Sequence, residues 1–184
     1  MTYLAMDELR AGLERIRQSP RDAGVLKLIV RRPKTGVREI LQEGQLDLVD
    51  GLVGDNWRTR GSFLTADGAA HPEMQLNVMN SRVIDLLAQS PDRWSLAGDQ
   101  LFVDLDLSAE NLPPGTQLAL GLAVIEVTKQ PHTGCAKFVE RFGLDAVKFV
   151  NSDEGKQLHL RGINARVALP GVIRIGDIVK KVRA

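Results

Sequence analysis

Cysteine is almost absent from this sequence: Cys135 is the only one in 184 residues. A single cysteine excludes an intramolecular disulfide and any zinc or iron–sulfur cage built from several cysteines. The three histidines, His71, His132 and His159, are widely separated and form no recognisable metal-binding motif. The sequence therefore predicts no zinc site and no other conventional metal centre.

Long hydrophobic runs are also missing. No apolar stretch approaches the length of a transmembrane helix, and residues 1–8 lack the basic and apolar regions of a signal peptide. We therefore expect a cytoplasmic protein that does not enter a membrane. Hydrophobic residues make up 43% of the chain and charged residues 26%, which is ordinary for a globular protein. The length suits one compact domain.

An overall excess of positive charge is lacking as well. The net charge is +1, but residues 1–34, 35–111 and 112–184 carry +4, −8 and +5, respectively. A nucleic-acid-binding protein would more often be basic overall, so we expect no nucleic-acid partner. The uneven distribution fits complementarity within the molecule, or a local pocket for a small anion.

Short strands with glycine and proline turns dominate the sequence after residue 100. In residues 100–107, Leu101, Val103, Leu105 and Leu107 would face one way and Asp104 and Asp106 the other, which is typical of a half-buried strand. Further strands are predicted at 25–30, 37–41, 117–128 (interrupted by Gly121), 164–169, 172–175 and 178–182. Helical spacing predicts helices at 5–18 and 79–88, and residues 43–75 show little periodicity. The pattern predicts a mainly β protein with a closed or nearly closed barrel and a few peripheral helices.

The segment from Pro131 to Gly143 carries the cysteine. Thr133 can cap a helix over residues 136–142, and Gly143 suits its end. Cys135 would then lie at the positive end of the helix, close in sequence to three cationic or titratable residues: His132, Lys137 and Arg141. Such surroundings lower a thiol pKa below about 8.5 and favour the nucleophilic thiolate. The alternative is a buried core thiol on the face shared by Phe138, Val139 and Phe142.

The second part of the chain resembles a known family. Residues Arg161–Val167 read RGINARV, residues Pro170–Asp177 read PGVIRIGD, and Cys135 follows the predicted long strand. Upstream, GDNW at residues 54–57 and SAENL at residues 108–112 complete an ordered set of motifs. Together they resemble the MOSC domain family, the type of domain found at the C-terminus of molybdenum-cofactor sulfurases.

The resemblance implies both a fold and a chemistry. Residues 50–184 would form a β-barrel of the pyruvate-kinase type, and residues 1–49 would supply an N-terminal helix and first strands, packed on the barrel or part of it. Cys135 would carry sulfur as a persulfide or ligate molybdenum, beside a molybdenum cofactor (molybdopterin) in a positively charged cleft. The family is also associated with pyridoxal phosphate through a fused desulfurase domain; no such domain fits here, so we expect no pyridoxal phosphate.

An anionic cofactor requires converging cations, and guanidinium groups suit its phosphate. The candidates are Arg58, Arg60, Arg161 and Arg166, although each could instead be solvated surface charge. We expect Arg58 and Arg166 to approach Cys135 in space. Other candidates have structural alternatives: Asn111 could donate to the cofactor or stabilise a turn, His132 could tune Cys135, release a proton or pack against the barrel end, and Asp55 could orient an arginine or form a turn.

Three functions remain open from the sequence. The first is a cofactor-binding or sulfur-carrying protein, supplied by a sulfur donor such as a cysteine desulfurase. The second is a small molybdenum-dependent oxidoreductase that reduces N-hydroxylated compounds with electrons from a separate partner. The third is a non-catalytic barrel that serves as an interaction module. Neither enzymatic turnover nor the oligomeric state follows from the sequence.

Overall fold

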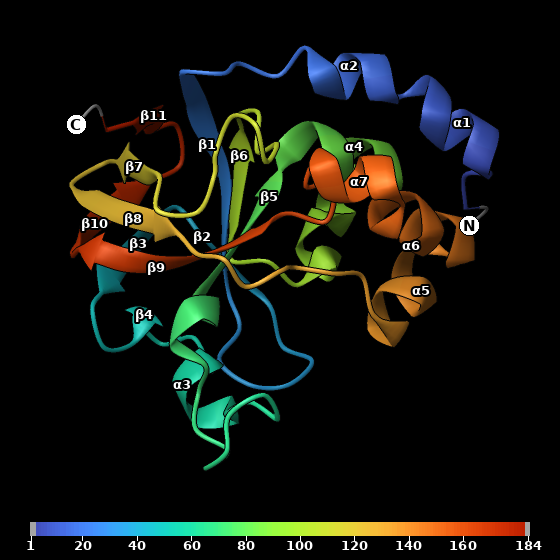
Figure 1. Cartoon of the computed structure of the whole chain (residues 1–184). Helices are drawn as coiled ribbons and strands as arrows, with labels where there is room; N and C mark the ends of the chain where they lie inside the picture. The colour runs from blue at the N-terminus through green and yellow to red at the C-terminus, as the bar shows by residue number, and fades with distance from the viewer. Residues whose placement is uncertain (1–2, 183–184) are drawn as a thin grey trace.

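A closed β-barrel forms the centre of the computed structural model, which describes residues 3–182 (Figure 1). Its seven strands run in the order β11–β7–β8–β9–β5–β6–β1, and pairing of β1 with β11 closes the barrel. Strand β2 adds to the edge of β1, and a separate small sheet has the order β10–β3–β4. The predicted mainly β barrel is thus confirmed.

The strands are short apart from the first, and glycine or proline lies in many of their connections. Their bounds are β1 Ala23–Arg31, β2 Glu39–Leu41, β3 Glu43–Asp47, β4 Gly51–Leu52, β5 Leu76–Asn80, β6 Leu101–Asp104, β7 Gln117–Leu120, β8 Ala123–Val127, β9 Ile163–Leu169, β10 Gly171–Arg174 and β11 Ile178–Lys181. Because β1 is a barrel strand, the barrel uses residues on both sides of the predicted boundary between residues 49 and 50.

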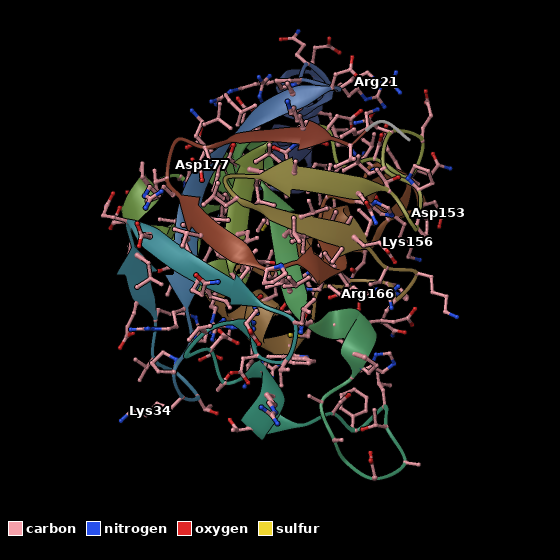
Figure 2. All side chains as sticks on the ribbon, turned by 90° about the vertical axis from the view of Figure 1, so that its left-hand side faces the viewer. Arg21, Lys34, Asp153, Lys156, Arg166 and Asp177 are labelled. Atoms are coloured by element: carbon pink, nitrogen blue, oxygen red, sulfur yellow. The ribbon has the colours of Figure 1, made fainter. Side chains whose placement is uncertain are left out.

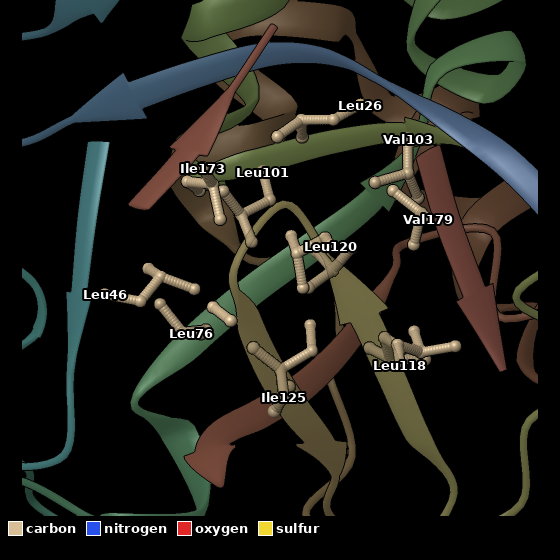
Figure 3. Close-up of a cluster of buried hydrophobic side chains, with 14 of the residues drawn as sticks. Leu26, Leu46, Leu76, Leu101, Val103, Leu118, Leu120, Ile125, Ile173 and Val179 are labelled. Carbon is tan, nitrogen blue, oxygen red and sulfur yellow. The ribbon is translucent and has the colours of Figure 1, made fainter. Parts of the chain in front are cut away.

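Apolar side chains at alternate positions of the strands fill the barrel interior. The four apolar residues predicted to share one face of the 100–107 segment are all buried in the interior cluster: Leu101, Val103, Leu105 and Leu107. Leucine, isoleucine and valine side chains from the other strands meet them there (Figure 3). Each fully buried side chain of this kind contributes about 1.5–3 kcal/mol of transfer free energy.

Most of the helices lie together on one side of the barrel, and α3 lies apart from them (Figure 1). Their bounds are α1 Met6–Ala11, α2 Leu13–Arg17, α3 Trp57–Arg60, α4 Ser81–Ala88, α5 Ala136–Phe142, α6 Leu144–Asn151 and α7 Asp153–Gln157, with 3-10 turns η1 Pro72–Met74 and η2 Pro91–Ala97. Met79 of β5 and Phe102 of β6 belong to a second core beneath α1, α2, α4, α5 and α6. Both faces of these two strands are therefore buried. Among the described residues, no helix combines the length and apolar character needed to cross a membrane.

The predicted helices are present with small shifts. The 5–18 segment forms two short helices separated by Gly12, and residues 136–142 form α5 as predicted. The 79–88 helix begins only at Ser81, because Met79 and Asn80 complete strand β5. Asn80 instead caps α4, and its side chain accepts a hydrogen bond from the Arg82 N–H at 2.8 Å. Residues 43–75 contain β3, β4, α3 and η1, so they are more regular than their sequence pattern indicates.

The prediction of one long strand over 117–128 is wrong. Gly121 has a φ of 54° and lies in a tight turn, so this segment is the hairpin β7–β8 rather than a strand with a bend. The turn packs closely on β10: the Leu122 N–H donates to the Val172 carbonyl at 3.0 Å. A left-handed residue within a close backbone contact is a position that favours glycine.

We predict that Gly121→Ala destabilises the protein more than Gly36→Ala. Both glycines have positive φ, 54° and 85°, which costs an L-residue about 1–2 kcal/mol. A Cβ at position 121 would also lie 2.6 Å from the Val172 carbonyl oxygen, whereas none of the described atoms lies within 4 Å at position 36. Gly121→Ala should therefore lose about 1–3 kcal/mol more unfolding free energy in urea denaturation. Equal losses would contradict this account of the turn.

Candidate functional site

A cavity beside Cys135 is lined mainly by positive side chains. It has a volume of about 150 Å³ and lies between the loop that follows β1, the start of α3, residues 97–98 and the start of α5. Seven of its lining residues are cationic: Arg32, Lys34, Arg38, Arg60, Lys137, Arg141 and Arg161. A concave site lined by one sign of charge concentrates ligands of the opposite sign.

A buried ion pair forms one wall of this cavity. The Asp55 carboxylate accepts hydrogen bonds from Nε and Nη2 of Arg32, both at 2.9 Å, and from the Arg32 backbone N–H at 2.9 Å. It also accepts from the Trp57 N–H at 2.9 Å, at the first residue of α3. The Asp55 side chain is fully buried and that of Arg32 is 6% exposed. Asp55 thus both orients an arginine and shapes the turn into α3.

Arg161 forms a second buried pair on another wall. Its Nη1 donates to both carboxylate oxygens of Asp99, at 3.0 and 2.8 Å. Its guanidinium carbon lies 4.7 Å from the centre of the Phe138 ring, a cation–π geometry that joins this pair to α5. Burial raises the pKa of Asp99, and the Arg161 guanidinium opposes that shift.

His132 lies behind this pair and does not line the cavity. Its Nδ1 is 3.5 Å from the Asp99 carboxylate, and its side chain is 12% exposed. Burial lowers the pKa of His132 well below its ordinary value of 6.5, and the charges of Arg161 and Arg32 lower it further. The imidazole is therefore neutral at pH 7, and the cations that face the thiol are arginines and lysines.

The five remaining cations are not neutralised. Within residues 3–182, none of them forms an ion pair with a carboxylate: Lys34, Arg38, Arg60, Lys137 and Arg141. Burial lowers the pKa of Arg38, and the charges of Arg141 and Arg32 lower it further. Burial and the charge of Arg32 likewise lower the pKa of Arg60. These guanidinium groups repel one another, and an anion between them would relieve that repulsion.

Cys135 lies at the mouth of the cavity, immediately before α5. Its side chain is exposed, whereas Phe138 and Phe142 of the same helix are buried, so the alternative of a core thiol does not hold. The preceding peptide is fixed by Asn151 of α6: the Gly134 N–H donates to Oδ1 at 2.9 Å, and the Gly134 carbonyl accepts from Nδ2 at 3.1 Å. The thiol is therefore both accessible and held on an ordered backbone.

The structure separates two of the predicted arginines. Arg60 lines the cavity, but Arg58, two residues earlier in α3, does not; it is largely exposed and pairs with Asp50 at 2.9 Å. Side chains two residues apart on a helix point in different directions, about 200° apart. Contrary to expectation, Arg58 therefore does not join Cys135 in the lining of the cavity.

Arg166 and Asn111 also lie outside the lining of the cavity. Arg166 faces outward from β9, pairs with Glu126 at 2.7 Å, and lies across the molecule from the lining residue Lys34 in Figure 2. Alternation explains this placement, because its neighbours in the strand point inward. Asn111 lies outside the cavity: its Nδ2 donates to two backbone carbonyls and its Oδ1 accepts from Lys181 Nζ at 2.8 Å. It stabilises a loop and leaves no group for a ligand.

Several residues of the cavity were not identified from the sequence. Arg161 and Arg60 were expected there, but Arg32, Arg38 and Lys34 were not. These three lie about a hundred positions before Cys135 and belong to no motif of the resemblance. Among the described residues, no cluster of three or more His, Cys, Asp or Glu side chains could hold a metal ion.

Solved structures with the same fold include YuaD and YiiM. YuaD from Bacillus subtilis has a TM-score of 0.64 at 16% identity, over 86% of this chain and 95% of YuaD. YiiM from Escherichia coli has a TM-score of 0.56 at 19% identity (87% and 70% covered), and YiiM from Geobacillus stearothermophilus 0.54 at 16% identity (90% and 75% covered). No family model and no curated protein sequence matches the chain. These likenesses support the MOSC-type fold that the sequence motifs imply, and at such identities they establish the fold alone.

We predict that Asp55→Asn is much more destabilising than Asp50→Asn. The first change leaves the buried Arg32 charge without its counter-ion, which typically costs about 3–5 kcal/mol. The second removes the exposed partner of Arg58, where about 0–1 kcal/mol is expected. Chemical denaturation of both variants measures the two losses. Similar small losses would mean that the Arg32–Asp55 pair does not hold the cavity wall.

A pH-dependent loss of stability is expected from His132. Its folded-state pKa is depressed, so below about pH 6.5 the unfolded chain binds a proton that the folded chain does not. Stability attributable to this residue is therefore complete above pH 6.5 and declines by up to about 1.4 kcal/mol per pH unit as the pH falls. We expect His132→Gln to flatten the unfolding free energy between about pH 6.5 and pH 5. Parallel pH profiles of the two proteins would contradict this.

Proposed function

We propose that the chain binds the molybdenum cofactor in the cationic cavity and uses Cys135 to carry sulfur as a persulfide or to ligate molybdenum. One observation carries the proposal: the exposed thiol shares the cavity with five cations that form no ion pair with any carboxylate in residues 3–182. The MOSC-type fold supports it. Membership of the MOSC family, and a cysteine desulfurase as sulfur donor, belong to the same proposal.

The residues present fit such a group. Phosphate accepts parallel hydrogen bonds from guanidinium forks, and a thiolate is a soft metal ligand. Three polar atoms of the lining are buried without a hydrogen-bond partner among the described residues: Nε of Arg38, Nε of Arg161 and Oδ1 of Asn56. Buried polar groups are normally satisfied, so an anionic ligand with both donors and acceptors would complete this lining.

The arginines and the cysteine of the lining would have different roles. Arg38, Arg60 and Arg141 would hold the phosphate of the cofactor, since no carboxylate in the described part of the chain pairs with any of them. Cys135 would present its sulfur, in a position fixed by the clamp of Asn151 on Gly134. The cofactor, when bound, would supply the molybdenum centre that exchanges sulfur. His132 is neutral and lies beside Asp99 rather than in the lining, so it would take no part in the binding of an anion.

We predict that Cys135→Ser abolishes molybdenum retention or persulfide formation and leaves stability nearly unchanged. The thiol is exposed, and surface substitutions usually change the unfolding free energy by less than about 0.5 kcal/mol. Molybdenum content by elemental analysis, pterin content by fluorescence and intact mass would be measured on protein from a host that makes the cofactor. The melting temperature is the matched readout of folding.

The arginines of α3 provide the control. Arg60→Gln should lower pterin content, whereas Arg58→Gln, which changes the same residue type two positions away but outside the cavity, should not. Absence of molybdenum, pterin and persulfide from the wild-type protein would contradict the proposed function. Equal pterin content in the two arginine variants would contradict the assignment of the cavity.

A further inference from the structure

The cavity is large enough and positive enough to hold a small dianion beside the thiol. Its volume of about 150 Å³ is bounded by the walls formed by Arg32 and Arg161, whose charges are neutralised by buried aspartates. The other five lining cations form no ion pair within residues 3–182, so the site as a whole carries an excess of positive charge. Two negative charges on a compact oxyanion would meet several of these groups at once.

A second observation, independent of the cysteine, also points to a ligand. Only 8% of the Arg161 side chain is exposed, and its Nε is buried with no hydrogen-bond partner among residues 3–182. Arg161 lines the cavity together with Cys135. An unsatisfied buried donor costs about 1–3 kcal/mol, so an acceptor that reaches it gains that free energy on binding.

We propose that Cys135 accepts sulfur directly from thiosulfate, a dianionic sulfur oxyanion, which the cationic cavity binds beside the thiol. This inference rests on the proposed role of Cys135 as a persulfide carrier and names a small-molecule donor for it. It assigns the protein a sulfurtransferase activity that does not require a donor protein.

The step is balanced without an added oxidant or reductant. The Cys135 thiolate attacks the outer sulfur of thiosulfate and forms a new S–S bond. The bond between that sulfur and the sulfonate sulfur breaks, and its electron pair leaves with sulfite. The products are the Cys135 persulfide anion and sulfite, so a charge of −3 is present on both sides, and no proton is transferred.

The cations favour this step for a specific reason. As the S–S bond breaks, negative charge accumulates on the departing sulfite. Fixed donors aimed at developing charge lower the free-energy barrier between reactants and products. Arg60 and Lys137 form no ion pair among the described residues, so their charge is available to the oxyanion. The same groups also draw the dianion towards the thiolate, which would otherwise repel it.

The test uses the full-length protein and thiosulfate as the probe. Loading is followed by intact mass, as a gain of one sulfur atom after thiosulfate is removed, and turnover by thiocyanate formed when cyanide takes the sulfur from the persulfide. We expect Cys135→Ser to show neither. Arg60→Gln and Lys137→Gln should load about tenfold more slowly, the loss expected for one charged hydrogen bond. Arg58→Gln should load at the wild-type rate, and sulfate should inhibit competitively.

A parallel reaction with a cysteine desulfurase and L-cysteine separates this inference from the proposed function. If the desulfurase loads Cys135 and thiosulfate does not, the small-molecule donor is refuted and the carrier function stands. If neither loads it, the carrier function fails as well. Equal loading rates in Arg60→Gln, Lys137→Gln and Arg58→Gln would refute the role of the cavity, provided that the melting temperatures show all three to be folded.

Discussion

The buried ion pair of Arg32 and Asp55 is the interaction on which the candidate site depends. One carboxylate accepts hydrogen bonds from the end of β1 and from the first N–H of α3, so it fixes these two segments to each other. Helix α3 has only four residues and could not hold its position through its own backbone bonds. Arg60, the last residue of α3, is therefore placed in the cavity by Asp55, five residues earlier in the chain, through its pair with Arg32.

The same pair is connected to the cysteine segment by a line of polar side chains. Arg32 Nη1 donates to Asn77 Oδ1 at 3.1 Å, and Asn77 Nδ2 donates to Asn164 Oδ1 at 2.6 Å. Asn164 Nδ2 then reaches the carbonyls of Gln130 and Pro131 at 3.0 and 3.2 Å. Buried polar networks of this kind are rigid when every member is satisfied. Strands β5 and β9, which carry Asn77 and Asn164, thus fix the position of the cysteine segment relative to Arg32.

Local patterns in the sequence were sufficient for the barrel and for the helix of the cysteine segment. The alternation from Leu101 to Leu107 reports which side of a strand is buried, and the bounds of α5 follow from apolar spacing and Gly143. The cavity could not be found in this way, because Arg38 and Cys135 lie far apart in the sequence and only the tertiary fold brings them to the same cavity. Nor could the sequence separate Arg58 from Arg60, since the direction of each depends on how α3 is docked. Gly121 was misread because a glycine fits both a bent strand and a tight turn.

Binding and stability are opposed in this cavity. Burial and mutual repulsion disfavour the charged forms of Arg38 and Arg60, so the folded chain carries an electrostatic cost that a neutral lining would not have. Two other lining arginines, Arg32 and Arg161, are neutralised by the buried carboxylates of Asp55 and Asp99 and form rigid walls of the cavity. The other lining cations, Arg38 and Arg60 among them, have no carboxylate partner among the described residues. An anion that bound only the folded state would recover part of this cost, so the affinity for such an anion and the electrostatic cost of the cavity would have the same physical origin.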